Sequence, residues 1–461
     1  MLFHTWTFFC FFAVALIGLL LLRKTPFWVH WILGSSYFFY GWWNYYYLAL
    51  IIYSTGLDFF TVRQMERPGA RKKLWLWISI LNNLSLLGFF KYADFFISNI
   101  NDLTGLNISP ASEIMPFGLE YLLPVGISFY TFQSMSYTID YYRGKIKRET
   151  SFIRFAAFVS FFPQLVAGPI ERAKSLLPQF QKFPKIKRHD IAAGASLFIV
   201  GLFKKLALAN YAALYVDRIY EDPASANGAS LALATFAFAW QIYFDFSAYT
   251  DMARGTARIM GFKLSLNFKN PYASSSLSEF WSRWHISLST WFRDYVYFPL
   301  GGNKKGTKRT YINLLSVFII SGLWHGAAWT FLAWGLLHGA GLTAEKALSN
   351  VKFTKVSLPR WVKIGVTFLL VCAGWIFFRA GSIDEALLIY RKIFSLEWND
   401  PQFPLFLLLM IGSVWTYQLL FETKLKKVLT ENWIRVPLLL GMIIYLFFCS
   451  SEGDQFIYFQ F

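Results

Sequence analysis

The stretch that decides the fold runs from residue 311 to residue 349 and reads YINLLSVFIISGLWHGAAWTFLAWGLLHGAGLTAEKALS. It is apolar over a length that suits a bent pair of helices. Basic clusters flank it on both sides: Lys304, Lys305, Lys308 and Arg309 before it, and Lys352, Lys355, Arg360 and Lys363 after it. Because basic loops of membrane proteins stay in the cytoplasm, the stretch is predicted to enter the bilayer and return to the same side.

The composition of the whole chain agrees with a membrane protein. Of its 461 residues, 56% are hydrophobic, 20% are aromatic and only 15% are charged. Ordinary soluble domains are about 45–50% apolar and about 25% charged. These figures exclude a soluble domain and a disordered chain, and they predict an all-α polytopic membrane protein.

Elsewhere, about ten apolar stretches are predicted to cross the bilayer, since a helical crossing needs about 20 mostly apolar residues. They are residues 2–22, 26–43, 45–62, 74–97, 119–140, 190–215, 229–250, 361–379, 402–420 and 435–450. Residues 152–170, which Pro163, Gly168 and Pro169 interrupt, are flanked by basic loops and are predicted to re-enter like 311–349. Irregular backbone is tolerated in a membrane only where protein or a water-filled cavity surrounds it, so both segments should line a cavity.

The formal net charge of +18 is explained by topology. Residues 63–73, 143–154 and 172–188 carry basic clusters, whereas 98–118 and 451–461 contain no Lys or Arg. The two kinds of loop alternate correctly if both termini lie outside the cytoplasm. The charge therefore predicts the lipid bilayer as a partner, and it gives no indication of nucleic-acid binding.

Polar residues concentrate in 279–302, within a long cytoplasmic or interfacial region spanning 251–310. Aromatic side chains at headgroup level and snorkelling arginines would explain most of this composition. They explain His285 less well, so this histidine is a candidate functional residue.

A second histidine, His325, lies between small residues near the middle of 311–349. A histidine on an apolar face is often a packed core residue, but polar groups inside membranes are costly and tend to be functional. A neutral imidazole can accept a proton near pH 7, which suits general-base catalysis on a hydroxyl. His338, thirteen residues further along, is interpreted as structural, and Asp245 and Asp251 as residues that orient or cap the following segment.

Several other kinds of site are excluded by the motifs. The sequence contains no H-E-x-x-H, paired C-x-x-C, G-x-S-x-G or P-loop lysine motif. Two histidines alone would leave a zinc ion short of ligands, so no metal site is predicted.

The run from Asn267 to Gly302 resembles the signature of membrane-bound O-acyltransferases (MBOAT). It is most similar to the bacterial branch with the membrane subunits of alginate and peptidoglycan O-acetyltransferases. The matching segments are 279–289 (EFWSRWHISLS), 291–295 (WFRDY), 123–129 (LPVGISF), 140–144 (DYYRG), 162–169 (FPQLVAGP), 322–329 (GLWHGAAW) and 456–461 (FIYFQF). One departure is Ser282, where relatives often carry a second arginine.

The resemblance implies a single MBOAT domain over 1–461, with a ring of about ten transmembrane helices and re-entrant segments around a central funnel. It implies that His325 is the essential membrane-embedded histidine, on a re-entrant catalytic helical pair at 311–349. His285 would be the second signature histidine, nearer the cytoplasmic mouth. The substrate-binding residues implied with them are Asn267, Arg283, Trp284, Arg293, Asp294 and Trp324.

The activity implied is transfer of an acetyl group from a cytoplasmic thioester to a hydroxyl outside. Acetyl-CoA is the expected donor substrate, and no permanently bound cofactor is expected. Basic residues at the funnel could hold its phosphates, although topology alone would also explain them. A donor to the tetrahedral oxyanion is needed, and His285, Trp324 or a backbone N–H could supply it.

The expected location is a bacterial cytoplasmic membrane. An extracytoplasmic, hydrolase-like acetyltransferase is the expected partner, docked near 382–400 or near Phe456–Phe461. The spacing of apolar residues in 382–397 predicts an amphipathic helix there. The acceptor polymer stays open among alginate, peptidoglycan, cellulose and other exopolysaccharides. A D-alanyl transferase for teichoic acids is the nearest alternative, and a transporter is the alternative from another class.

Overall fold

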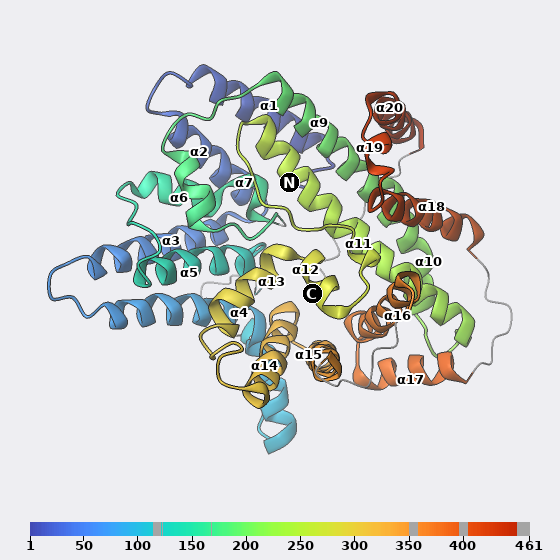
Figure 1. Ribbon diagram of the computed structural model, residues 1–461. Helices are drawn as coiled ribbons and strands as arrows, with labels where there is room; N and C mark the ends of the chain where they lie inside the picture. The colour runs from blue at the N-terminus through green and yellow to red at the C-terminus, as the bar shows by residue number, and fades with distance from the viewer. Residues whose placement is uncertain (114–120, 122, 167, 350–357, 396–403, 450–461) are drawn as a thin grey trace. The chain divides into compact units, whose positions relative to one another are not determined.

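The computed structural model describes residues 1–113, 121, 123–166, 168–349, 358–395 and 404–449. All regular secondary structure in these ranges is helical (Figure 1). The predicted all-α class is therefore confirmed for the described part of the chain.

Four helical segments among the described residues are long and apolar enough to cross a membrane. They are α4 (Lys72–Thr104), the continuous segment Arg188–Tyr220, α11 (Gly228–Ile259) and α16 (Arg360–Arg379). Shorter apolar helices are α1 (Trp6–Leu21), α18 (Leu405–Phe421) and most of α20 (Asn432–Cys449). These helices agree with an integral membrane protein, while the ring of about ten crossings stays a prediction.

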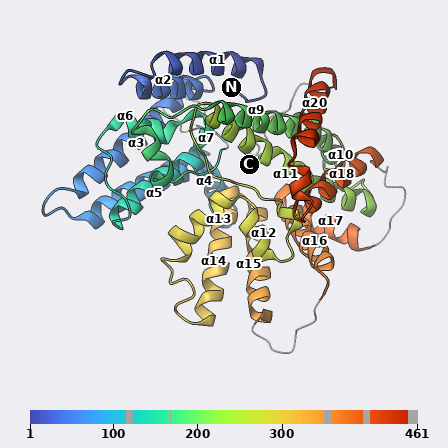
Figure 2. The same ribbon diagram turned by 45° about the horizontal axis from the view of Figure 1, so that its top comes forward.

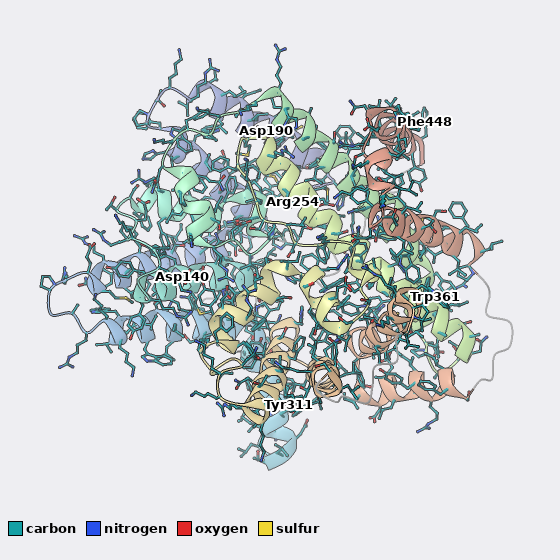
Figure 3. All side chains as sticks on the ribbon, viewed as in Figure 1. Asp140, Asp190, Arg254, Tyr311, Trp361 and Phe448 are labelled. Atoms are coloured by element: carbon teal, nitrogen blue, oxygen red, sulfur yellow. The ribbon has the colours of Figure 1, made fainter. Side chains whose placement is uncertain are left out.

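Each stretch that was predicted to cross contains a helix. The remaining ones hold α2 (Trp28–Gly41), α3 (Tyr45–Met65) and α5 (Ile127–Tyr142). The helix in the predicted span 119–140 starts at Ile127, and residues 119–120 and 122 lie outside the described residues. Large apolar side chains are exposed on several of the apolar helices. Examples are Trp361 of α16, which is 75% exposed, and Phe448 of α20, which is 77% exposed; both are labelled in Figure 3. Exposed apolar surface of this kind suits contact with lipid.

The described chain divides into two compact units. One comprises 1–198 with 252–265, and the other comprises 199–251 with 266–461. In the first unit, α2 packs on α6 (Phe152–Ser160), and α3, α4 and α5 pack on one another. The second unit contains every candidate site residue.

The helix break predicted within 152–170 is present. Helix α6 ends at Ser160, and the short helix α7 (Phe162–Leu165) follows it. At the start of α5, Gly126 has a φ of +75°, and a side chain there would collide with the carbonyl oxygen of Leu165. The glycine is required because the broken segment passes directly against the beginning of α5.

The pair of helices predicted for 311–349 is also confirmed. Helices α14 (Thr307–His325) and α15 (Trp329–Ser349) lie side by side, joined at Gly326 (Figures 1 and 2). A side chain at Gly322 would collide with the carbonyl oxygen of Phe331, and one at Gly335 with that of Phe318. These glycines let the two backbones approach closely, as small residues do in membrane helix pairs.

Helix α17 (Ile383–Phe394) confirms the predicted amphipathic helix. Ser382 caps it through its hydroxyl, which accepts the Glu385 N–H at 3.1 Å. Ala386 and Ile389 are buried, whereas Phe394 is 76% exposed. Residues 396–400 and 456–461, also considered for docking, lie outside the described residues.

Asp245 and Asp251 join α11 to an irregular turn, and their predicted role of orienting or capping the following segment stays a prediction. Asp245 forms an ion pair with Lys205 and Asp251 one with Lys204, each with an N–O distance of 2.7 Å. Both lysines belong to a π-helical segment, Lys204–Ala209, between α9 (Arg188–Phe203) and α10 (Asn210–Tyr220). The carboxylates thus tie α11 to this irregular turn.

Candidate active site

The site is assembled around Asn267, which is 1% exposed. Its side-chain oxygen accepts the backbone N–H of Ser287 at 3.2 Å and the Ser287 hydroxyl at 2.9 Å. The same oxygen lies 3.2 Å from Nδ1 of His285. In addition, the backbone carbonyl of Asn267 accepts the N–H of Ile286 at 2.9 Å. Asn267 therefore fixes the backbone and the imidazole at the start of α13 (Ile286–Phe292).

These contacts determine the tautomer of His285. A backbone N–H only donates, so the Asn267 atom that faces Ser287 must be the oxygen. Since that oxygen only accepts, Nδ1 of His285 carries the proton and Nε2 carries the lone pair. Burial lowers the pKa of His285 to about 3, which keeps the ring neutral at physiological pH.

The backbone around His285 is strained. His285 has a φ of +42°, and it shares a left-handed conformation with Asn270, which has a φ of +43°. Such conformations cost about 1–3 kcal/mol in residues other than glycine, and they cluster at functional sites. The left-handed conformation of His285 turns the chain sharply between α12 (Leu277–Arg283) and α13. The His285 ring is buried at this turn.

His325 is the last residue of α14 and is 4% exposed. Its ring contacts aromatic rings from two further helices, with centroid distances of 5.0 Å to Trp334 and 5.3 Å to Phe378. A side chain at the following Gly326 would collide with the ring of Phe331. The helix thus ends where the imidazole enters an aromatic enclosure.

Trp324 brings the two candidate histidines into one cluster. Its ring lies 6.1 Å from that of His285 and 5.0 Å from that of His325, centroid to centroid. The structure thus brings Asn267, His285, Trp324 and His325 together, while their predicted catalytic and substrate-binding roles stay predictions.

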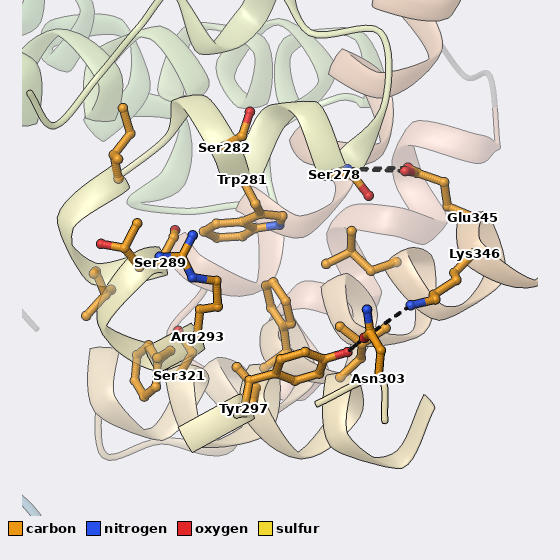
Figure 4. A pocket seen from close by; sticks show the side chains of 18 of the residues that line it. Ser278, Trp281, Ser282, Ser289, Arg293, Tyr297, Asn303, Ser321, Glu345 and Lys346 are labelled. Carbon is orange, nitrogen blue, oxygen red and sulfur yellow. Dashed lines mark hydrogen bonds between the residues drawn. The ribbon is translucent and has the colours of Figure 1, made fainter. Parts of the chain in front are cut away.

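A cavity of about 620 Å³, whose lining residues Figure 4 shows, lies in the same unit and is lined by residues close to this cluster in the sequence. Its walls include Ile286, which follows His285, and Ser321, one helical turn before His325. Apolar side chains from α14 and α15 line it together with Trp281 and Arg293. The cavity is large enough for a substantial part of a small-molecule ligand.

Polar contacts hold the walls of the cavity in place. The carboxylate of Glu345 accepts the backbone N–H of Leu277 at 2.8 Å, which joins α15 to the start of α12. Asn303 accepts hydrogen bonds from the hydroxyl of Tyr297 and, at 3.4 Å, from the ammonium of Lys346 (Figure 4). The cavity is therefore bounded by the segment 277–303 and the two helices of the hairpin.

The four other predicted substrate-binding residues are not equivalent. Arg293 lines the cavity and lies 2.9 Å from the carboxylate of its neighbour Asp294. Arg283 forms ion pairs with two carboxylates, Glu279 at 2.7 Å and Glu422 at 3.2 Å. It is not among the residues that line the cavity. Trp284 is 1% exposed and packs on Phe280, Trp375 and Phe268.

Sequence reasoning missed Trp281 and Trp334 as parts of the site, and it interpreted His338 as structural. Their rings contact one another beside His325. The signal available in the sequence was the density of aromatic residues, which does not reveal which rings meet.

Comparison with known proteins assigns the chain to a family. The model of the membrane-bound O-acyltransferase family matches residues 143–383, which include every residue described above from Asn267 to Phe378. The chain belongs to this family. It is an acyltransferase, and its apolar helices agree with an integral membrane enzyme.

Named relatives within the family include O-acetyltransferases. A probable alginate O-acetylase from Pseudomonas putida is 42% identical over 80% of this chain and 75% of its own length. A peptidoglycan O-acetyltransferase from Helicobacter pylori is 33% identical over 100% of this chain and 98% of its own. A teichoic acid D-alanyltransferase from Bacillus subtilis is 31% identical over 55% of this chain and 68% of its own.

Proposed function

We propose that this membrane O-acyltransferase moves an acetyl group from a cytoplasmic thioester, acetyl-CoA, to a hydroxyl on the other side of a bacterial cytoplasmic membrane. The observation that carries the proposal is the His325–Trp324–His285 cluster beside a cavity of about 620 Å³. The names of the relatives with the longest matched regions support acetyl as the acyl group.

The thioester end of the donor would occupy the cavity. Arg293 and Lys346 at its wall offer positive charge to the phosphates of coenzyme A, and Leu314, Val317 and Leu342 offer apolar surface to the pantetheine arm. The basic loops that flank the hairpin would place the cavity mouth on the cytoplasmic side. Both termini would then lie outside the cytoplasm.

His325 would act as the general base. Its ring would take the proton of the acceptor hydroxyl as the hydroxyl oxygen attacks the thioester carbonyl carbon. The bond from carbon to sulfur would break, and the sulfur would leave as a thiol after taking that proton from His325. His285, whose lone pair sits on Nε2, would orient a reacting group from the opposite side of Trp324.

The acetyl group would reach an extracytoplasmic polysaccharide such as alginate or peptidoglycan through a hydrolase-like partner outside the membrane. Helix α17 supports this part of the proposal, because its exposed Leu387 and Phe394 offer an apolar surface to a partner. The region considered for docking is 382–400.

The test replaces His325 with Ala and measures ester-linked acetyl on the cell-surface polysaccharide. We expect a loss of at least a hundredfold, in line with removal of a general base. The matched control is His189→Ala, since His189 has an 80% exposed side chain and should tolerate the change. Normal acetylation by a His325→Ala protein that is expressed at the normal level would refute the proposal. Loss of ester-linked alanine in place of acetyl would redirect it to D-alanyl transfer.

A further inference from the structure

Three aromatic side chains in the site form a closed triangle that has no role in the mechanism above. They are Trp281 of α12 and Trp334 and His338 of α15. Their ring centroids lie 5.6 Å apart for the two tryptophans, 5.2 Å for Trp281 and His338, and 5.0 Å for Trp334 and His338. Trp334 and His338 are completely buried.

The ring nitrogens of this triangle have no hydrogen-bond partner within the described part of the chain. This applies to Nε1 of Trp281, Nε1 of Trp334 and both nitrogens of His338, all of them buried atoms. A buried polar group without a partner costs about 1–3 kcal/mol, and such groups in native proteins call for an explanation. An indole N–H can only donate, so the group that satisfies it must be an acceptor.

The imidazole of His338 is also held in a fixed place. A Cβ atom on Gly374 of α16 would lie only 2.6 Å from Nε2 of His338, so a glycine is required opposite the ring. Phe280 and Phe318 stack on the same imidazole, with centroids 6.5 Å and 6.4 Å away. The three rings are therefore packed rigidly, as a binding site for a small polar group requires.

The position of the triangle connects the cavity with His325. Trp281 lines the cavity, whereas the ring of Trp334 lies 5.0 Å from that of His325. A thioester whose arm fills the cavity would therefore present its carbonyl group near the triangle. His325 would remain within reach of the attacking hydroxyl.

We propose that Trp281, Trp334 and His338 form the subsite that receives the carbonyl oxygen of the thioester. This inference rests on the proposed function, because the carbonyl oxygen belongs to the acetyl-CoA donor named there. As the acceptor hydroxyl attacks, its proton passes to His325 and negative charge develops on the carbonyl oxygen. Indole N–H donors in a dry enclosure stabilise that charge. When the bond to sulfur breaks, the carbonyl double bond forms again and the sulfur leaves as a thiol with the proton from His325.

The experiment measures binding of two probes to the purified full-length chain in nanodiscs. Acetyl-CoA carries the carbonyl, and S-ethyl-coenzyme A is a thioether in which a methylene group replaces it. We expect the unmodified chain to bind acetyl-CoA about threefold to tenfold more tightly, which corresponds to one net hydrogen bond. In Trp334→Phe and His338→Phe this ratio should fall toward one, while the affinity for S-ethyl-coenzyme A changes less than twofold.

Trp240→Phe is the matched control. Trp240 is a completely buried indole of α11 whose ring packs on Phe244 and Tyr272, and it is not a lining residue of the cavity. The control should keep the ratio of the unmodified chain. Equal affinity of the unmodified chain for both probes would overturn the subsite, since the triangle would then hold only water. If neither probe binds, the result would instead count against the donor named in the proposed function.

Discussion

Asn267 offers the most direct test of how the site is held together. Replacing it with Leu keeps the approximate volume but removes the oxygen that accepts from Ser287 twice and from His285 once. At about 1 kcal/mol per net hydrogen bond, the loss of three predicts destabilisation of about 3 kcal/mol. The donors left behind are buried, so water cannot easily replace the lost acceptor.

The effect on catalysis should exceed a simple loss of stability. Without Asn267 the proton of His285 is free to move to Nε2, and the ring loses its fixed orientation. We expect acetylation to fall at least tenfold in protein that remains folded, as is usual when the group that orients a functional histidine is removed. The measurements are reversible unfolding of the purified chain in mixed detergent and acetyl content of the polysaccharide in cells.

Asn267→Asp is the matched variant. It keeps an acceptor opposite Nδ1, so the tautomer should survive, but its carboxylate favours the protonated imidazole. The pKa of His285, which burial now lowers to about 3, should rise. If the reaction needs neutral His285, the acidic limb of the pH profile moves to higher pH, and activity at alkaline pH is retained. An Asn267→Leu chain within 1 kcal/mol of the unmodified chain and with full activity would refute this reasoning.

Two further predictions concern stability. Lys205→Met should destabilise the chain by about 3–5 kcal/mol, because it removes the ion-pair partner of the buried Asp245. The double variant Lys205→Met/Asp245→Leu should recover most of that loss. Equal unfolding free energies for the single and double variants would argue against the pair. Gly335→Ala should cost about 1–3 kcal/mol and reduce acetylation, because the added methyl group meets the carbonyl oxygen of Phe318 and pushes α14 from α15. Gly365→Ala is its control, since an added Cβ there has nothing within 4 Å. Equal thermal unfolding temperatures for the two glycine variants would contradict the close approach of α14 and α15.

The elements that sequence reasoning predicted best are those whose signals are local. The apolar stretches, the interruption at Pro163 and the glycine turn beside His325 each appear in the chain as a helix, a helix break or a helix end. The pairing of Asp245 with Lys205 could not be predicted, because it depends on a π-helical turn in a different helix. The same holds for Arg283, whose second carboxylate, Glu422, is supplied by the residue that follows α18.

In the candidate site, too, local sequence signals were predictive and contacts between distant segments were not. His325 stands out because a histidine in an apolar stretch needs a reason, and His285 because interfacial aromatic residues and snorkelling arginines do not explain it. Asn267 was predicted through the resemblance as a substrate-binding residue, and its contact with His285 was not predicted, since no local pattern links the two residues. His338 was interpreted as structural, and that interpretation stays open, because no sequence pattern indicated its contacts with Trp281 and Trp334.

The aromatic richness of the chain acquires a specific meaning at this site. His325 ends α14, so the backbone beyond it leaves the helix at Gly326 in a segment predicted to lie within the membrane. Irregular backbone at that depth must be enclosed by protein. The rings of Trp334 and Phe378 provide that enclosure, and they do so without adding charges that would compete for a proton. His325 is 4% exposed, so its imidazole is shielded from bulk water, and such shielding favours acyl transfer to a hydroxyl over transfer to water.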